Sequence, residues 1–412
     1  MTGPRVPYLQ SASTWGSEEV SAAKAVLDSG YCTMGPRVAE FERSFAEWVG
    51  ARHAVMVNSG SSANLLAVEV MLRRPGRLAP WRAGDEVLVP ALAWPTTVWP
   101  LVQLGLVPVF CDVDPETLAL CLESAASVLS PRTRGMVVIH VQGLAAPTGP
   151  YVEFCRAHDL VLIEDCCETV GAHSGGRHVG TFGAVGTFST YFSHQLVTIE
   201  GGLVVTDDLA LADDLRSARS HGWARDRTDR ETWATRYPEI DERFMFIGQG
   251  YNVRPTDLQG AIGSVQLRKL GEMLRRREAL AGQVHEWLPR WVRMVGIEHL
   301  PPFGTCFGSR ESRRNSWMSM MLMVERGAPC GAGTLRRYLA GRGVESRPII
   351  AGNLTRHPGA AGIACRRAAG LEVADDVFER GLMLGCHPFP AEGSLETLEA
   401  ALAGFRNPGS GT

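Results

Sequence analysis

Short apolar runs alternate with helical segments over about 150 residues, and this alternation restricts the possible folds more than any other feature of the chain. The runs are EVLVP at 86–90, VPVFCDV at 107–113, GMVVIHV at 135–141, LVLIED at 160–165, GTFSTYF at 186–192 and GLVVTD at 202–207. Chains that alternate in this way form a mostly parallel sheet with helices on both faces. The sequence therefore predicts an α/β fold.

The rest of the chain predicts a second, smaller domain. Apolar residues at helical spacing predict helices at 17–29, 36–50, 63–72, 208–223, within 251–288, at 333–343 and at 394–405. A charged stretch at 224–246 is expected to form a surface loop, and 316–324 resembles a strand. Because 412 residues are too many for one small core, we expect a large α/β domain at 1–270, a small C-terminal α+β domain at 271–405 and a disordered tail at 406–412.

Composition argues against several classes of protein. The net charge of −3 gives no electrostatic case for binding nucleic acid or an anionic membrane. No apolar run is long enough to span a membrane, and the first residues do not have the pattern of a signal peptide. Ten cysteines are scattered without a CxxC pair, which is typical of reduced thiols in a cytoplasmic protein. Lys24 and Lys269 are the only lysines.

Three short motifs follow predicted strands. Gly60, Ser61 and Ser62 lie where the strand HAVMV turns into a helix, and free N–H groups there favour an anion such as phosphate. An ordinary helix cap is the alternative. Trp94 follows EVLVP, and a lone tryptophan at such a place is more often a core residue than a cofactor contact. Asp165 ends a buried strand, where α/β sheets bind their ligands, with Glu168 three residues later; Asp165 could instead cap a turn.

A fourth motif, TFSTYFSHQLVTIEGG at 187–202, carries the most information. It predicts a strand, a polar turn and then a second strand after Gly201 and Gly202. His194 alone would be read as a residue that satisfies a local hydrogen bond. However, the stretch resembles the cofactor loop of the DegT/DnrJ/EryC1/StrS family, sugar aminotransferases that use pyridoxal phosphate (PLP). In that family the pattern is roughly S-F-H-P-x-K-x-x-T-x-G-E-G-G, and here His194 replaces the lysine that binds PLP.

The resemblance covers roughly residues 7 to 360 and implies the fold of PLP-dependent transferases of type I, which is like that of aspartate aminotransferase. It assigns the cofactor phosphate to Gly60, Ser61, Ser62 and Ser189. The pyridine ring would stack on Trp94 and bind Asp165 through its nitrogen, with Glu168 near the ring oxygen. Asn252 would reach the phosphate of a neighbouring subunit, which implies a homodimer with active sites at the interface.

A histidine in place of the lysine changes the implied reaction. Imidazole cannot hold PLP covalently, because its ring nitrogen has no second hydrogen to lose, but it transfers protons well near neutral pH. One branch of the family, the nucleotide-sugar 3-dehydratases, has this histidine and uses pyridoxamine phosphate (PMP). We therefore expect C3 dehydration of a nucleotide-linked 4-keto-6-deoxyhexose, with His194 as the base at cofactor C4′ and PMP regenerated from glutamate.

Two further expectations follow from this branch. His221, Arg347 and Asn353 are candidates for binding the sugar or glutamate, although Arg347 and Asn353 could equally be structural. Some members hold a [2Fe-2S] cluster through four cysteines that include a C-x-C pair. This chain has no such pair and no cysteine between 168 and 305, so we expect neither a cluster nor another metal.

Other functions stay open at this point. Another lysine-free PLP reaction on a sugar or aminocyclitol, such as epimerisation, deamination or an atypical amino transfer, is the main alternative. A non-catalytic relative with a vestigial site is the third. The presence of Ser61, Trp94, Asp165, Ser189 and Asn252 argues against it.

Overall fold

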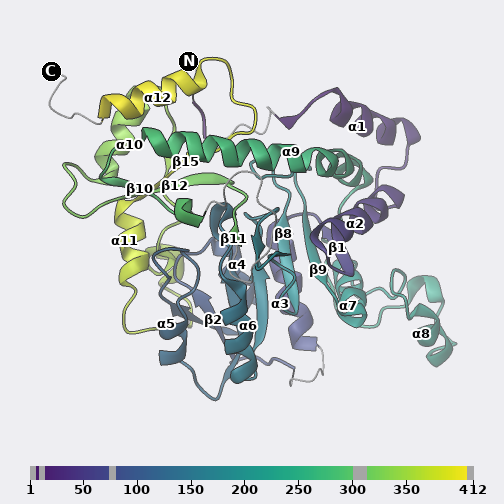
Figure 1. Cartoon of the computed structure of the whole chain (residues 1–412). Helices are drawn as coiled ribbons and strands as arrows, with labels where there is room; N and C mark the ends of the chain where they lie inside the picture. Colours follow the sequence, from purple (N-terminus) through teal and green to yellow (C-terminus); the bar gives the residue numbers. More distant parts are fainter. Residues whose placement is uncertain (1–5, 9–13, 74–79, 300–312, 406–412) are drawn as a thin grey trace.

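The computed structural model describes residues 6–8, 14–73, 80–299 and 313–405, and its main feature is an eight-stranded sheet (Figure 1). The spatial order is β1-β9-β8-β5-β4-β2-β3-β14. Strand β9 runs antiparallel to β1 and β8, and the other neighbouring pairs are parallel. The strands are β1 (His53–Val57), β2 (Glu86–Pro90), β3 (Val107–Cys111), β4 (Thr133–Ile139), β5 (Val161–Asp165), β8 (Val185–Ser189), β9 (Gly202–Thr206) and β14 (Arg366–Arg367).

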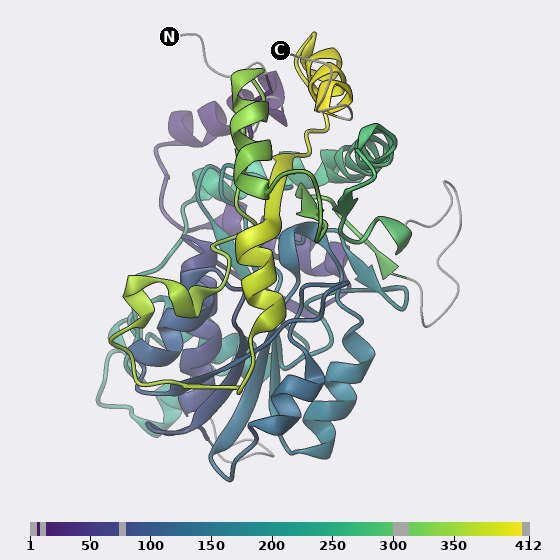
Figure 2. The same cartoon turned by 90° about the vertical axis from the view of Figure 1, so that its left-hand side faces the viewer.

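Helices cover both faces of this sheet (Figures 1 and 2), which is why its strands are apolar runs rather than alternating patterns. Every residue of β2, β8 and β9 is buried. The helices of this part are α1 (Ser17–Ser29), α2 (Pro36–Val49), α3 (Gly60–Arg73), α4 (Pro95–Gln103), α5 (Leu122–Ser127), α6 (Thr148–Ala157), α7 (Leu209–Arg219) and α8 (Arg230–Arg236). The predicted α/β class and mixed sheet are confirmed.

A second sheet of four strands lies above the main sheet in Figure 1, in the order β10-β12-β15-β13. Helix α9 (Asp257–Trp287) runs from α2 to this sheet and lies within the range 251–288 that is predicted to contain a helix. The strands are β10 (Val292–Met294), β12 (Ser319–Val324), β13 (Ser346–Arg347) and β15 (Gly381–Gly385), and the helices are α10 (Ala332–Gly341), α11 (Glu372–Arg380) and α12 (Ser394–Phe405).

The structure differs from the sequence-based expectations in three places. The predicted strand at 186–192 ends at Ser189, because the chain turns there and the His194 N–H donates to the Tyr191 carbonyl oxygen (3.0 Å). The predicted surface loop at 224–246 contains α8, which projects from the body in Figure 1. Strand β14 returns to the main sheet from the C-terminal part of the chain, a pairing with β3 that two residues cannot signal in a sequence.

Short elements complete the fold. A hairpin of β6 (His173–Ser174) and β7 (Arg177–His178) turns at Gly175 and Gly176, both with positive φ, and pairs with β11 (Arg313–Arg314). The 3₁₀ helices are η2 (Val141–Gly143), η3 (Glu242–Phe244), η4 (Ile297–His299), η5 (Leu354–Arg356) and η6 (Pro358–Ala360).

The predicted domain boundary and the predicted C-terminal tail are not tested by this fold. The division into domains at 1–270 and 271–405 stays a prediction, and the boundary falls inside α9. The predicted tail at 406–412 lies outside the described residues. Among the described helices, none combines the length and the apolar character that crossing a membrane requires.

Candidate active site

A pocket of about 590 Å³ opens at the carboxyl ends of the main-sheet strands. Asp165 is the last residue of β5 and Ser189 is the last residue of β8, so both side chains reach the same edge of the sheet. The structure brings eight of the predicted site residues together in its lining: Gly60, Ser61, Trp94, Asp165, Glu168, Ser189, His194 and Arg347.

His194 is half-buried in this pocket and is held at one ring nitrogen. Its Nδ1 lies 3.3 Å from the carbonyl oxygen of Ser189. Because a carbonyl only accepts hydrogen bonds, this contact assigns the proton to Nδ1 and leaves the Nε2 lone pair available. Burial lowers the pKa of His194 to about 4, against the opposing effects of the Ser189 carbonyl and Asp165. The imidazole is therefore neutral at pH 7 and can accept a proton.

Asp165 is buried and fixed by three hydrogen bonds. Asn64 Nδ2 (2.8 Å) and Thr97 Oγ1 (2.7 Å) donate to its Oδ2, and the backbone N–H of Cys167 donates to Oδ1 (3.0 Å). Thr187 Oγ1 in turn donates to Asn64 Oδ1 (2.6 Å), which sets the orientation of the amide. Three donors give this carboxyl group a fixed direction, as a partner for a ring nitrogen needs.

The first turn of α3 forms a wall of the pocket beside β8 and β9. A Cβ on Gly60 would lie 2.5 Å from the Cβ of Ser189 and 3.0 Å from its Oγ, and a Cβ on Gly202 would overlap the backbone of Ser59. The two glycines therefore allow the helix start to approach the strand ends. Ser59 caps the helix, since its Oγ accepts from the Ser62 N–H (3.1 Å). The free N–H groups of the first turn and the hydroxyl of Ser189 suit a phosphate.

Glu168 is the second carboxyl group of the pocket. The backbone N–H of Gln142 donates to its Oε2 (3.2 Å). Burial raises the pKa of Glu168 to about 7, the Gln142 N–H lowers it and the charge of Asp165 raises it further. Gln142 adopts positive φ (49°), and its side-chain oxygen accepts from Ser319 Oγ (2.7 Å). The strained backbone of Gln142 thus aims an N–H group at Glu168.

The N-terminal segment contributes Tyr8 to the lining, where its hydroxyl donates to Gln142 Oε1 (3.3 Å). Val6 pairs with the strand-like segment at 343–345, and the Tyr8 N–H donates to Glu345 (2.9 Å). The guanidinium of Arg347 lies 4.4 Å from the centre of the Tyr8 ring and pairs with Glu345 (3.0 Å). Burial raises the pKa of Tyr8, which therefore stays protonated at neutral pH. Arg347 is the arginine whose side chain lines this pocket.

Trp94 lies at the N-terminus of α4 with 54% of its surface exposed. An exposed indole in the lining of a pocket differs from a core tryptophan, which was the alternative reading. It offers a flat face to a planar group.

Four predicted residues lie outside the lining. Ser62 faces away, and its hydroxyl donates to Asn58 Oδ1 (2.6 Å). Asn252 is exposed and accepts from Arg254 (3.0 Å), and His221 is exposed with positive φ. Asn353 is buried, caps η5 and donates to Asp375 (2.9 Å), which is the structural role that the sequence left open.

The sequence reading missed several residues that complete the site, namely Tyr8, Asn64, Thr97 and Gln142. Asn64 left a weak signal, because it is an isolated amide in the apolar helix ANLLAVEVML. Thr97 left a similar one in the apolar segment after Trp94. Tyr8 and Gln142 left none, since their place depends on long-range pairing and on a strained backbone.

No lysine lines this pocket. Lys269 pairs with Glu18 (2.7 Å) and Glu19 (2.9 Å), and Lys24 is exposed on α1. A cofactor here has no amine of the protein to which it could be attached.

One group of possible metal ligands occurs in the described part of the chain: His140, Glu164 and Cys166. His140 Nδ1 accepts from the Ala146 N–H (3.1 Å), and its Nε2 contacts Glu164 (3.2 Å). Glu164 also accepts from three N–H groups of the loop at 180–183, each at 2.7 Å. These atoms are already used, which indicates a structural network. Cys306 lies outside the described residues, so the expectation of no cluster stays a prediction.

Comparison with known proteins relates the whole chain to sugar-modifying enzymes. The model of the DegT/DnrJ/EryC1/StrS aminotransferase family matches residues 14–402. GDP-4-keto-6-deoxy-D-mannose 3-dehydratase of Yersinia pseudotuberculosis is 33% identical over 397 residues, which cover 94% of this chain and 96% of that protein. dTDP-4-dehydro-2,6-dideoxy-D-glucose 3-dehydratase of Saccharopolyspora spinosa is 33% identical over 406 residues, 94% of this chain and 84% of the relative.

Solved structures agree with these sequence comparisons. The structure of Escherichia coli GDP-4-keto-6-deoxy-D-mannose-3-dehydratase with bound hydrated PLP superposes with a TM-score of 0.85 at 30% identity, covering 97% of this chain and all (100%) of that one. A variant of GDP-4-keto-6-deoxymannose-3-dehydratase with bound GDP-perosamine gives a TM-score of 0.84 at 30% identity over 96% of this chain and 100% of the other.

Proposed function

Because the chain belongs to the DegT/DnrJ/EryC1/StrS aminotransferase family, we propose that it is a PLP/PMP-dependent nucleotide-sugar 3-dehydratase. Its reaction removes the C3 hydroxyl of a nucleotide-linked 4-keto-6-deoxyhexose. The observation that carries this proposal is His194, a neutral histidine lining a pocket that contains no lysine. The names of the similar enzymes support the substrate class, and 3-dehydratases are among the relatives on both the sequence and the structure side.

The residues of the pocket fit this cofactor. The first turn of α3 at Gly60 and Ser61 and the hydroxyl of Ser189, which lies directly beside Gly60, suit the phosphate, together with Ser62 by resemblance. The three-donor cradle holds Asp165 ready to keep a pyridine nitrogen protonated. Trp94 supplies the flat face for the ring, and Glu168 lies in the same lining.

When bound, PMP supplies an amine that can condense with the keto group of the sugar and a ring that accepts electrons. His194 moves the proton at C4′, since its Nε2 carries a lone pair at neutral pH and its Nδ1 is anchored to Ser189. Glu168, whose pKa is raised to about 7, can hold or release a proton in the same pocket. Arg347 would bind the sugar or a carboxylate of glutamate, the proposed amino donor, and His221 and Asn353 stay weaker candidates for substrate contacts.

The proposal includes a homodimer with active sites at the subunit interface. Three large apolar side chains are exposed in the lining or next to it: Trp94 (54%), Tyr191 (41%) and Phe192 (39%). Such side chains suit contact with a second protein surface. Asn252, exposed and outside its own pocket, would then serve the cofactor phosphate of the partner. The nine described cysteines are free, which supports a cytoplasmic location.

Mass spectrometry of the products tests the function. Purified protein is mixed with PLP, glutamate and a panel of nucleotide-linked 4-keto-6-deoxyhexoses. We expect one sugar to lose the mass of one oxygen atom, with release of ammonia and 2-oxoglutarate. A product with nitrogen in place of oxygen would instead identify an aminotransferase.

Two variants of His194 test its role. His194→Asn should bind the cofactor but lose dehydration, and His194→Lys should turn yellow as the new amine binds PLP. Loss of cofactor binding in His194→Asn would mean that this residue holds the cofactor and does not move a proton.

A further inference from the structure

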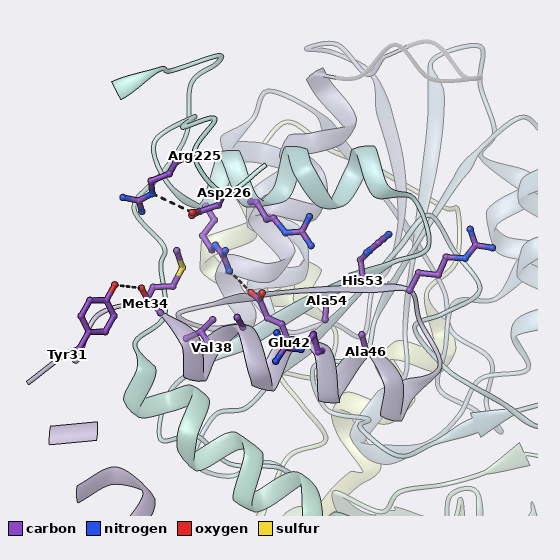
Figure 3. Close-up of a pocket in the computed structure, with 15 residues that line it drawn as sticks. Tyr31, Met34, Val38, Glu42, Ala46, His53, Ala54, Arg225 and Asp226 are labelled. Atoms are coloured by element: carbon purple, nitrogen blue, oxygen red, sulfur yellow. Dashed lines mark hydrogen bonds and ion pairs between the residues drawn. The ribbon is translucent and has the colours of Figure 1, made fainter. Parts of the chain in front are cut away.

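A second cavity, of about 600 Å³, lies at the edge of the main sheet, between α2, β1 and α7 (Figure 3). It shares no lining residue with the active-site pocket. Short apolar side chains form part of its wall, including Val38 and Ala46 of α2 and Ala54 of β1. Because these side chains are small, they leave room for a molecule between the helices.

Positive charge dominates the rest of the lining. Five arginines face two carboxyl groups, Glu42 and Asp226. Three of the arginines have acidic partners: Arg219 pairs with Glu42 (2.6 Å), Arg216 with Asp213 (2.8 Å) and Arg225 with Asp226 (3.4 Å).

The other two arginines are Arg43 of α2 and Arg52, which directly precedes β1. Among the described residues, neither guanidinium has an ion pair or a hydrogen bond. The contacts between these elements are made by a third arginine: Arg219 of α7 pairs with Glu42 of α2 and donates to the Met56 carbonyl oxygen of β1 (2.7 Å). Two guanidinium groups of this cavity are therefore available to bind an anion.

Buried atoms without partners also line this cavity. Arg219 is 3% exposed, and its Nε donor has no hydrogen-bond partner. Asp226 Oδ2 is a buried acceptor without a partner. Buried donors and acceptors are normally satisfied, so the Nε of Arg219 and the Oδ2 of Asp226 are two atoms at this cavity that lack a partner within the described part of the chain. Phosphate oxygens match the arginine donors, and a hydroxyl group matches the carboxylate.

We propose that this cavity binds a small phosphorylated sugar or polyol, with its phosphate on the exposed guanidinium groups of Arg43 and Arg52 and a hydroxyl group on Asp226. The site is separate from the pocket proposed for catalysis and does not depend on the dehydratase reaction. Arginine suits this role because its planar guanidinium donates two parallel hydrogen bonds to a phosphate.

Calorimetry on the cofactor-loaded protein tests the site with glucose 1-phosphate, inorganic phosphate and glucose as probes. We expect glucose 1-phosphate to bind more tightly than inorganic phosphate, and glucose alone not to bind. The double variant Arg43→Gln/Arg52→Gln should weaken glucose 1-phosphate binding by about tenfold or more for each lost charge-assisted contact. Both side chains are exposed, so the fold should be retained.

Arg290→Gln is the matched control, since Arg290 is exposed beyond the far end of α9. It should bind glucose 1-phosphate like the unaltered protein. Binding that is absent at millimolar concentration, or equal in the double variant and the control, would overturn the proposal. Equal affinity for inorganic phosphate would refute the hydroxyl contact. Cofactor absorbance, unchanged in all variants, separates these outcomes from any failure of the active site.

Discussion

At the scale of single residues, Glu168 shows what burial does to an ordinary carboxyl group. Its pKa rises from 4.5 to about 7, because the surrounding pocket favours the neutral form more than the Gln142 N–H favours the charged one. Below about pH 4.5 the group is protonated in both the folded and the unfolded chain. Between pH 4.5 and 7 this carboxyl group is deprotonated in the unfolded chain but still protonated in the folded one. The free energy of unfolding therefore falls by roughly 3 kcal/mol as pH rises through this window.

Replacement of Glu168 by Gln should remove this pH dependence. The glutamine in Glu168→Gln cannot ionise. The free energy of unfolding of this variant minus that of the unaltered protein should therefore rise by up to about 3 kcal/mol from pH 5 to pH 8. Urea denaturation at both pH values measures the effect. Glu153→Gln is the control, because Glu153 is an exposed residue of α6. Parallel pH curves for Glu168→Gln and the unaltered protein would show that Glu168 titrates normally.

The sequence predicted the residues whose type and place carry their own signal. Asp165 ends an apolar run, and His194 stands where a related family has lysine. The residues that orient them were not predictable in the same way. Thr97 reaches Asp165 across 68 positions and Asn64 across 101, so only the pairing of distant strands shows that they are neighbours. A polar residue in an apolar helical segment is only a weak signal, and it does not say which residue the side chain contacts.

At the scale of elements, the start of α3 depends on two positions without side chains. Gly60 and Gly202 let the first turn of the helix approach β8 and β9 closely, next to the site proposed for the phosphate. The apolar runs predicted the strands on either side, since period and length are local properties. The short pairing of β14 and the seven-residue α8 were missed because so few residues carry no periodicity of their own.

Gly202→Ala should separate α3 from the strands. The added methyl group would overlap the backbone of Ser59, so we expect a loss of about 1–3 kcal/mol in stability and a weaker affinity for PLP. Thermal unfolding and a titration followed by PLP absorbance measure the two effects. Gly149→Ala, in α6 with open space around it, should not reduce either quantity. Equal PLP affinity in the two variants would show that the close approach does not shape the phosphate site.

At the scale of the whole molecule, the position of Asn252 bears on the proposed dimer. It is exposed and outside the lining of its own pocket, although the family resemblance links it to the cofactor phosphate. Both statements hold if Asn252 acts on the partner's site.

Hybrid dimers distinguish the two possibilities. His194→Asn and Asn252→Ala should each have little activity as homodimers. A hybrid of the two, purified through different tags, contains one site with both native residues and should recover about half of the native activity. A hybrid as inactive as its parents would place Asn252 in its own subunit's site.

The pairing of the N-terminal segment with the C-terminal part of the chain sets an order of events during protein synthesis. Tyr8 leaves the ribosome among the first residues, yet its hydroxyl contacts Met383, and Val6 pairs with a segment that begins at Gly343. A nascent chain that ends before residue 343 could build the main sheet up to β9 but would have no partner for its own beginning. The pocket wall closes only when nearly the whole chain has been made, so binding of substrate is a property of the finished protein.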